Sequence, residues 1–302
     1  MYDLIIVGGG PAGLTAAIYA RRAEKSVLVL EKNNFGGQIA WSPRVDNFPG
    51  RPSVSGAALA DTLVTQATEL GTEIDLAAVT GIEDLGDRKL VHTEFGDQEC
   101  RAVVLATGAR HRHLGVPREE ELTGNGVSYC AVCDGAFYKD RPVAVCGGGD
   151  AALQDAICLA GTCSTVYLIH RRDEFRAEAA NVKAAHARSN IRFVMNSRVT
   201  ALVGDDELKG VVIEGDASPQ PKTLPVDGLF VAVGFESENE PFRSVADLSG
   251  SGWFASGEDC RTRTPGVFAA GDCRDKTVRQ LTTAVGDGAA AAVAACRYLD
   301  RA

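Results

Sequence analysis

The sequence predicts an α/β fold in which one domain is inserted into another. The prediction rests on a repeated pattern, because an apolar strand, a glycine turn and an apolar helix occur at 4–23 and again at 143–159, with the helices expected at about 12–23 and 151–159. Each helix is followed by a further apolar strand, at 26–30 and at 165–169. Strand–helix–strand units of this kind are typical of Rossmann-like dinucleotide-binding domains.

A second repeat indicates how the two domains are connected. The segments 103–108 and 229–234 resemble each other, and each is expected to be a later strand of its own domain. The segment 266–272, near the C-terminus, is a strand ending in Gly-Asp and suits the last strand of the first domain. The second domain is therefore nested within the first.

The chain is expected to cross between the domains at two stretches, 111–117 and 235–241, which are polar or contain proline, as linkers tend to be. We expect a discontinuous domain of residues 1–112 and 242–302 and an inserted domain of residues 113–241.

Composition and charge exclude several classes of protein. The net charge of the 302 residues is −9, so a nucleic acid backbone would be repelled. No apolar run approaches the roughly 20 residues that span a bilayer. The start of the sequence has no basic segment or cleavage site typical of a signal peptide. We expect a cytoplasmic protein with no nucleic acid or membrane partner.

The first glycine turn reads Gly8-x-Gly10-x-x-Gly13 and lies between a strand and a helix. The first glycine permits the tight turn, the second lets the backbone approach a pyrophosphate, and the third lets the helix pack on the strand. Glu31 follows 18 residues after Gly13, at the end of the next strand. A carboxylate there accepts hydrogen bonds from a ribose diol, which favours a dinucleotide without a 2′-phosphate.

The second glycine turn reads Gly147-x-Gly149-x-x-Ala152, and its strand end carries no acid. Residues 170–172 read His-Arg-Arg, and Arg176 follows. Guanidinium groups bind a phosphate through paired hydrogen bonds, so this turn favours NADP over NAD. Two dinucleotide sites on one chain indicate hydride transfer between a nicotinamide and a flavin.

Cys130 and Cys133 form the only Cys-x-x-Cys among nine cysteines. Two thiols at this spacing at a helix start can form and exchange a disulfide, and the helix N-terminus lowers a thiol pKa. Asp134 follows directly and could move a proton. A metal site would need two further ligands, and His111 and His113 match zinc spacing poorly. The pair is therefore interpreted as redox-active, and the other seven cysteines as buried small apolar residues.

These motifs, taken in order, resemble thioredoxin reductases of the low-molecular-weight class over nearly the whole chain. The redox motif Cys-Ala-Val-Cys-Asp-Gly at 130–135 and the motif His-Arg-Arg-Asp-Glu-Phe-Arg at 170–176 carry much of the resemblance. Three further segments match those that contact the flavin in this family: 36–38, 46–50 and 106–108.

The resemblance implies a homodimeric enzyme with non-covalent FAD that uses NADPH to reduce thioredoxin or a thioredoxin-like protein. Cys133 would lie nearest the flavin, Cys130 would attack the partner disulfide, and Asp134 would be the general acid. No metal is implied. The residues expected to bind the two cofactors are Gly8, Gly10, Pro11, Ala12, Gly13, Glu31, Gly37, Gln38, Asn47, Thr107, Gly108, Gly271, Asp272, Arg279, Gln280 and Leu281 for FAD, and Gly147, Gly149, Asp150, Ala151, His170, Arg171, Arg172 and Arg176 for NADPH.

Two other functions compete with this one. Glutathione reductase-like enzymes place a more widely spaced disulfide near the first glycine turn and use a C-terminal histidine, whereas this chain has no histidine after His186. A non-catalytic flavin-binding redox sensor would need no nucleotide-phosphate site, and the arginines at 171, 172 and 176 argue against it.

Overall fold

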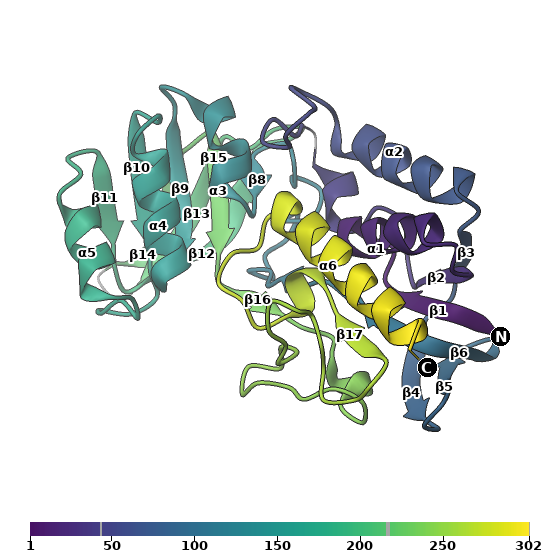
Figure 1. The fold of residues 1–302 in the computed structure, drawn as a ribbon. Coiled ribbons are helices and arrows are strands. Elements are labelled where there is room, and N and C mark those ends of the chain that lie inside the picture. The colour runs from purple at the N-terminus through teal and green to yellow at the C-terminus, as the bar shows by residue number, and fades with distance from the viewer. Residues whose placement is uncertain (43, 216–217, 302) are drawn as a thin grey trace. The chain divides into compact units, whose positions relative to one another are not determined.

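The computed structural model describes residues 1–42, 44–215 and 218–301, and divides the chain into two compact units (Figure 1). Unit 1 contains residues 1–110 and 236–302, and unit 2 contains residues 111–235. The second crossing thus falls at 235/236, earlier than the expected 241/242. The reason is local packing, since the Ser237 hydroxyl donates to the Gly252 carbonyl and the Asn239 side chain bonds to Thr107, Gly252 and Cys273, all of them in unit 1.

Unit 1 is built on a seven-stranded sheet. In sheet order its strands are β3 (Glu73–Leu76), β2 (Val27–Glu31), β1 (Tyr2–Val7), β6 (Gly96–Leu105), β5 (Lys89–Thr93) and β4 (Val79–Asp84), with β17 (Val267–Ala269) also paired to β6. The pairs among β3, β2, β1, β6 and β17 are parallel, and β4, β5 and β6 are antiparallel.

Both faces of this sheet are buried. Leu4 and Ile6 of β1 belong to one apolar cluster, and Ile5 and Val7 belong to the other, because successive side chains of a strand point to opposite faces. The first cluster lies under α1 (Pro11–Arg22), α2 (Gly56–Glu69) and α6 (Leu281–Leu299). A strand buried on both faces explains the unbroken apolar run at the start of the chain.

The remaining elements of unit 1 are short. They are the 3-10 turns η1 (Gly37–Trp41), η3 (Glu240–Phe242) and η4 (Gly271–Cys273). Helix α6 packs closely on α1, since a Cβ at Gly288 would lie 2.2 Å from the Ala12 carbonyl oxygen.

Unit 2 contains a five-stranded parallel sheet. In sheet order its strands are β11 (Ile191–Val194), β10 (Thr165–Ile169), β9 (Pro142–Gly147), β15 (Gly228–Ala232) and β8 (Val127–Ser128). Its helices are α3 (Ala131–Asp134), the 3-10 turn η2 (Gly135–Tyr138), α4 (Asp150–Leu159) and α5 (Ala179–His186). A three-stranded antiparallel sheet of β12 (Ser197–Val203), β13 (Gly210–Gly215) and β14 (Ser218–Pro225) completes it. The two crossings, β7 (Arg110–His111) and β16 (Phe235–Glu236), pair with each other.

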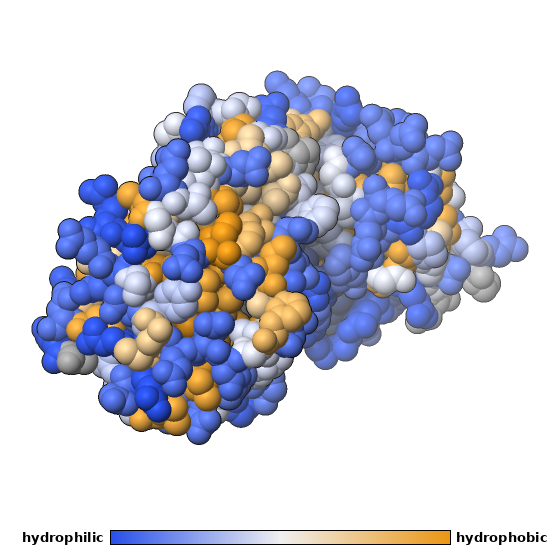
Figure 2. All heavy atoms as spheres, turned by 90° about the vertical axis from the view of Figure 1, so that its right-hand side faces the viewer, coloured by the Kyte–Doolittle hydropathy of each residue, from blue (hydrophilic) through white to orange (hydrophobic). Residues whose placement is uncertain are grey.

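On the face shown in Figure 2, patches of apolar side chains lie among mostly hydrophilic residues. Within the described ranges, no helix is both long enough and apolar enough to cross a bilayer.

Candidate dinucleotide-binding and redox sites

The first glycine turn connects β1 to α1 and leaves no room for side chains. Gly8 has a φ of +110°, and a Cβ there would lie 2.2 Å from the Ala106 carbonyl oxygen. A Cβ on Gly13 would lie 1.9 Å from the Gly8 carbonyl oxygen. Only glycine fits these two positions, so the turn brings the start of α1 directly against the ends of β1 and β6.

The start of α1 is suited to an anion. Its N-cap, Gly10, offers no side chain, Pro11 occupies the first turn, and no acidic residue lies there. The free N–H groups of a helix start and its positive dipole favour a phosphate. Glu31, at the end of β2, accepts hydrogen bonds from the N–H of Gly9 (2.7 Å) and of Asn33 (3.0 Å).

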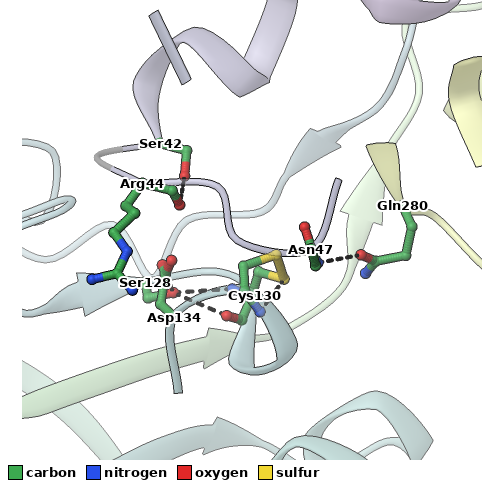
Figure 3. Close-up of a disulfide and its surroundings, with 8 residues drawn as sticks. Ser42, Arg44, Asn47, Ser128, Cys130, Asp134 and Gln280 are labelled. Atoms are coloured by element: carbon green, nitrogen blue, oxygen red, sulfur yellow. Dashed lines mark hydrogen bonds between the residues drawn. A yellow bond between two sulfur atoms is a disulfide. The ribbon is translucent and has the colours of Figure 1, made fainter. Parts of the chain in front are cut away.

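Further predicted residues gather around this turn within unit 1. A Cβ on Gly37 would lie 3.1 Å from the Cα of Gly10, and one on Gly271 would lie 2.8 Å from the Cβ of Ala12. Gln38 is exposed on η1. The Asn47 side chain donates to the Oε1 of Gln280 at 3.4 Å (Figure 3), which connects the segment at 46–50 to the start of α6.

Asp272 carries a buried oxygen that has no hydrogen-bond partner among the described residues. Its Oδ1 makes no hydrogen bond within the described residues, and burial raises the pKa of this carboxyl, with Lys276 acting in the opposite direction from 3.8 Å. The turn before it is fixed by Asp287 of α6, whose Oδ2 accepts from the N–H of Gly271 (3.0 Å) and from Lys276 Nζ (2.9 Å). A buried acceptor with no donor is a position that a ligand hydroxyl can complete.

Arg279 is held from two sides. Its guanidinium stacks over the Trp253 ring, 4.1 Å from the ring centroid. It also donates to the carbonyls of Asp272 (3.1 Å) and Arg274 (3.2 Å). Leu281 is the first residue of α6, directly after the N-cap Gln280, which forms a capping box with Thr283.

One residue that the sequence did not single out connects several of these segments. Asn239 is fully buried, and its side-chain oxygen accepts a hydrogen bond from the Thr107 hydroxyl at 2.7 Å. Its amide donates to the carbonyls of Gly252 and Cys273, both at 3.0 Å. Asn239 therefore fixes the end of β6, where Gly108 follows with a φ of +72°. No local pattern marks this asparagine, because its partners are far away in the chain.

The second glycine turn connects β9 to α4 in unit 2. A Cβ on Gly147 would lie 2.3 Å from the Ala232 carbonyl oxygen, so β15 approaches this turn as β6 approaches the first. Gly149 is the N-cap of α4, and Asp150 and Ala151 begin the helix. The structure thus repeats the strand–turn–helix geometry of unit 1.

The middle residue of each glycine turn is also constrained. A Cβ on Gly148 would lie 2.1 Å from the His170 ring, and one on Gly9 would lie 2.5 Å from the Phe35 ring. His170 is buried, its Nε2 lies 3.1 Å from the Glu174 carbonyl oxygen, and desolvation lowers the pKa of its imidazole. His170 therefore supports the loop that follows β10.

The loop after β10 carries three arginines whose side chains are at least partly exposed. Arg171 and Arg176 are exposed and Arg172 is partly exposed. Across the described residues, none of their guanidinium groups makes a hydrogen bond or an ion pair. Cations left unpaired on a fixed loop are available to a phosphate.

The cysteine pair forms a disulfide in unit 2, with 5.3 Å between the Cα atoms. Cys130 is the N-cap of α3, and its Sγ accepts from the N–H of Cys133 at 3.2 Å. The expected placement at a helix start is confirmed. Among the free cysteines Cys158, on α4, is exposed and Cys296, on α6, is only partly buried, so the expectation that all seven are buried is wrong for these two residues.

Asp134 lies next to the disulfide (Figure 3). Its Oδ2 accepts from the Ser128 hydroxyl at 2.6 Å, and the same hydroxyl accepts from the N–H of Cys130 at 3.1 Å. Its Oδ1 is buried without a partner. Burial raises the pKa of Asp134, and the Ser128 hydrogen bond lowers it to a lesser degree. The carboxyl is therefore protonated over a wider pH range than a solvent-exposed one, and can act as an acid.

Known proteins match this architecture over its whole length. The model of the pyridine nucleotide-disulphide oxidoreductase family matches residues 2–288. The chain is 42% identical over 301 residues to a thioredoxin reductase of Mycolicibacterium smegmatis, covering 99% of this chain and 97% of that protein. It is 39% identical over 301 residues to a thioredoxin reductase of Listeria monocytogenes serovar 1/2a, covering 99% and 94%.

A solved structure agrees with these relatives. The thioredoxin reductase of Streptococcus pyogenes MGAS5005 superposes with a TM-score of 0.95 at 40% identity, over 100% of this chain and 99% of that one.

Proposed function

Since the chain belongs to the pyridine nucleotide-disulphide oxidoreductase family, and within it to the thioredoxin reductases, we propose that it uses NADPH to reduce the disulfide of thioredoxin or a thioredoxin-like protein. The observation that carries the proposal is the Cys130–Cys133 disulfide at the start of α3, with the partly buried Asp134 directly beyond it. Family membership implies a flavin and a pyridine nucleotide, and we propose FAD and NADPH.

The residues around the first glycine turn fit FAD. Gly10 and the start of α1 would hold the pyrophosphate, Glu31 would accept from the adenosine ribose, and the unpartnered Oδ1 of Asp272 would accept from a hydroxyl of the flavin half. FAD, when bound, supplies the hydride and electron transfer that protein side chains lack. The carboxylate of Glu31 suits a ribose hydroxyl at this turn and would repel a 2′-phosphate.

The residues around the second glycine turn fit NADPH. Gly149 and the start of α4 would hold the pyrophosphate, and the unpaired guanidinium groups of Arg171, Arg172 and Arg176 would bind the 2′-phosphate. His170 would act through its packing against the turn.

The cysteines and Asp134 would carry out the thiol chemistry. By the family resemblance, the reduced Cys130 thiolate attacks the partner disulfide, forming a mixed disulfide and expelling one partner thiolate. Cys133 then attacks Cys130, re-forms the 130–133 disulfide and releases the second partner thiolate. Asp134 donates a proton to a departing thiolate, for which its raised pKa suits it. We further propose a homodimer in the cytoplasm with no nucleic acid or membrane partner.

The test compares cysteine variants of the FAD-loaded protein. Cys130→Ser and Cys133→Ser should still have their flavin bleached by NADPH under anaerobic conditions, but should no longer reduce thioredoxin. Cys158→Ser is the matched control, because this exposed cysteine lies outside the disulfide, and it should turn over at the wild-type rate. Thioredoxin reduction retained by Cys133→Ser would contradict the proposal, and so would a wild-type flavin that NADPH fails to bleach.

A further inference from the structure

The loop that carries the three arginines, residues 170–178, is fixed to its surroundings at alternate positions. The N–H of His170 donates to the Val194 carbonyl (2.9 Å), and the Arg172 carbonyl accepts from the N–H of Asn196 (3.1 Å). The N–H of Arg176 donates to the Gly148 carbonyl at 2.7 Å. The backbone of the loop is thus anchored while its guanidinium groups remain unpaired.

The far end of this loop is fixed by a single carboxylate. Asp150, the first residue of α4, accepts through Oδ1 from the N–H of Glu178 (2.8 Å) and from the side-chain amide of Asn181 (2.7 Å). Glu178 is the N-cap of α5 and Asn181 lies in its first turn. The Asp150 carboxylate therefore lies in the first turn of α4 and accepts hydrogen bonds from the start of α5, and the dipoles of both helices stabilise it.

We propose that Asp150 and Asn181 are positioning residues that give the nucleotide site its preference for a 2′-phosphate. The inference rests on the proposed function, because it assigns the glycine turn to the pyrophosphate and the arginines to the 2′-phosphate. The contact between Asp150 and α5 sets the spacing between these two parts of the site. Gly148 and Arg176 fix the loop at its middle, and Asp150 fixes it where it enters α5.

The energetic reason is preorganisation. Three long cationic side chains on a loose loop must lose conformational freedom, together with the loop, when they bind one phosphate. An anchored loop has lost part of that freedom before the phosphate binds, so the entropic cost of binding is smaller. Only a ligand that contacts both the turn and the arginines gains from the anchoring. A ligand that lacks the 2′-phosphate gains nothing from it.

Electrostatics predicts the opposite effect, which makes the inference testable. The hydrogen bonds from Asn181 and from the Glu178 N–H lower the pKa of Asp150, so the carboxylate is ionised at neutral pH. A negative charge near a phosphate site repels the phosphate, and its removal alone should tighten binding. If Asp150 acts by positioning, its removal weakens binding instead.

The experiment measures the affinity of the FAD-loaded protein for two probes by isothermal titration calorimetry. The first probe, 2′,5′-ADP, carries the 2′-phosphate, and the second, 5′-AMP, lacks it. We expect Asp150→Ala to weaken 2′,5′-ADP binding by about tenfold while 5′-AMP changes by less than about twofold. Asn181→Ala should show a smaller loss, and the double variant should lose no more than Asp150→Ala, because both side chains act through one contact. In turnover, KM for NADPH should rise with kcat unchanged.

Two control variants separate position from charge. Asp150→Asn keeps a side-chain oxygen that can accept from the N–H of Glu178, so it should recover most of the 2′,5′-ADP affinity. Asp173→Asn removes an exposed carboxylate of the same loop that makes no hydrogen bond, and should leave 2′,5′-ADP binding unchanged or tighter.

Several results would overturn the inference. Wild-type or tighter 2′,5′-ADP binding by Asp150→Ala would show that charge outweighs position. Equal losses for both probes would show that Asp150 only stabilises the glycine turn. A wild-type protein that binds 2′,5′-ADP no better than 5′-AMP would instead overturn the assignment of NADPH itself.

Discussion

Asp155 on α4 offers a test of how burial affects the stability of unit 2. Its carboxyl is largely enclosed and makes no hydrogen bond or ion pair with the residues that the structure describes. Burial raises its pKa to about 7. At pH 8 the folded protein therefore holds an ionised carboxylate that has lost part of its hydration and has gained no partner.

The sign and size of the effect follow from the two pKa values. In the unfolded chain Asp155 titrates near pH 4, so between about pH 4 and 7 the folded state binds more protons than the unfolded state. Stability falls as pH rises through this window, and the full cost is present above pH 7. Three pKa units correspond to about 4 kcal/mol, and residual solvent exposure reduces this to about 2 kcal/mol.

The perturbation is Asp155→Asn, which keeps the shape of the side chain and removes its charge. We expect the variant to be more stable than the wild type by about 2 kcal/mol at pH 8 and by little at pH 4.5. Urea unfolding of the FAD-loaded protein, followed by circular dichroism at both pH values, measures the difference. Asp173→Asn is the control, because this exposed acid should have no such effect. An equal gain for Asp155→Asn at both pH values would refute the reasoning.

Two further predictions concern binding and stability. Arg171→Ala/Arg172→Ala should weaken NADPH binding by tenfold or more, since each charge-assisted hydrogen bond contributes about 1.5–3 kcal/mol. The use of NADH should stay nearly unchanged. Steady-state kinetics with both nucleotides checks this, and a retained NADPH preference would contradict the assignment. Asn239→Ala should lower the free energy of unfolding by about 2–3 kcal/mol, because the Thr107 hydroxyl and two carbonyls lose a buried partner. Thermal unfolding with FAD bound measures the loss. An unchanged melting temperature would show that these groups find other partners.

Local sequence patterns predicted the elements around both glycine turns closely. The helices expected at 12–23 and 151–159 lie at Pro11–Arg22 and Asp150–Leu159, and the strand expected at 165–169 lies at Thr165–Ile169. The reason is that a tight turn needs glycine at fixed positions and a buried parallel strand needs an unbroken apolar run. Both requirements are met within a few neighbouring residues and are visible in one segment.

Contacts between distant segments could not be predicted in this way. Asn239 reaches Thr107 across 132 positions, and Ser244 reaches Ile82 across 162 positions. The antiparallel sheet of β12–β14 was not anticipated, because its short strands carry no motif. Cys158 was expected to be buried because cysteine usually is, but the helical position of this residue places it on the exposed side of α4.

The two glycine turns also show why the middle glycine of each Gly-Gly-Gly is needed, although the dinucleotide pattern leaves that position open. In unit 1 the ring of Phe35, which follows β2, occupies the space that a side chain on Gly9 would need. In unit 2 the ring of His170, which follows β10, occupies the corresponding space at Gly148. The same glycine makes a hydrogen bond to that segment, through the N–H of Gly9 to Glu31 and through the Gly148 carbonyl to the N–H of Arg176. The turn that would hold the pyrophosphate thus fixes the Glu31 carboxylate in unit 1 and the backbone that carries the Arg176 side chain in unit 2. Because that turn is nearly the same in both units, the proposed difference in nucleotide preference would come from the residues at the ends of β2 and β10, where one unit has a carboxylate and the other has guanidinium groups.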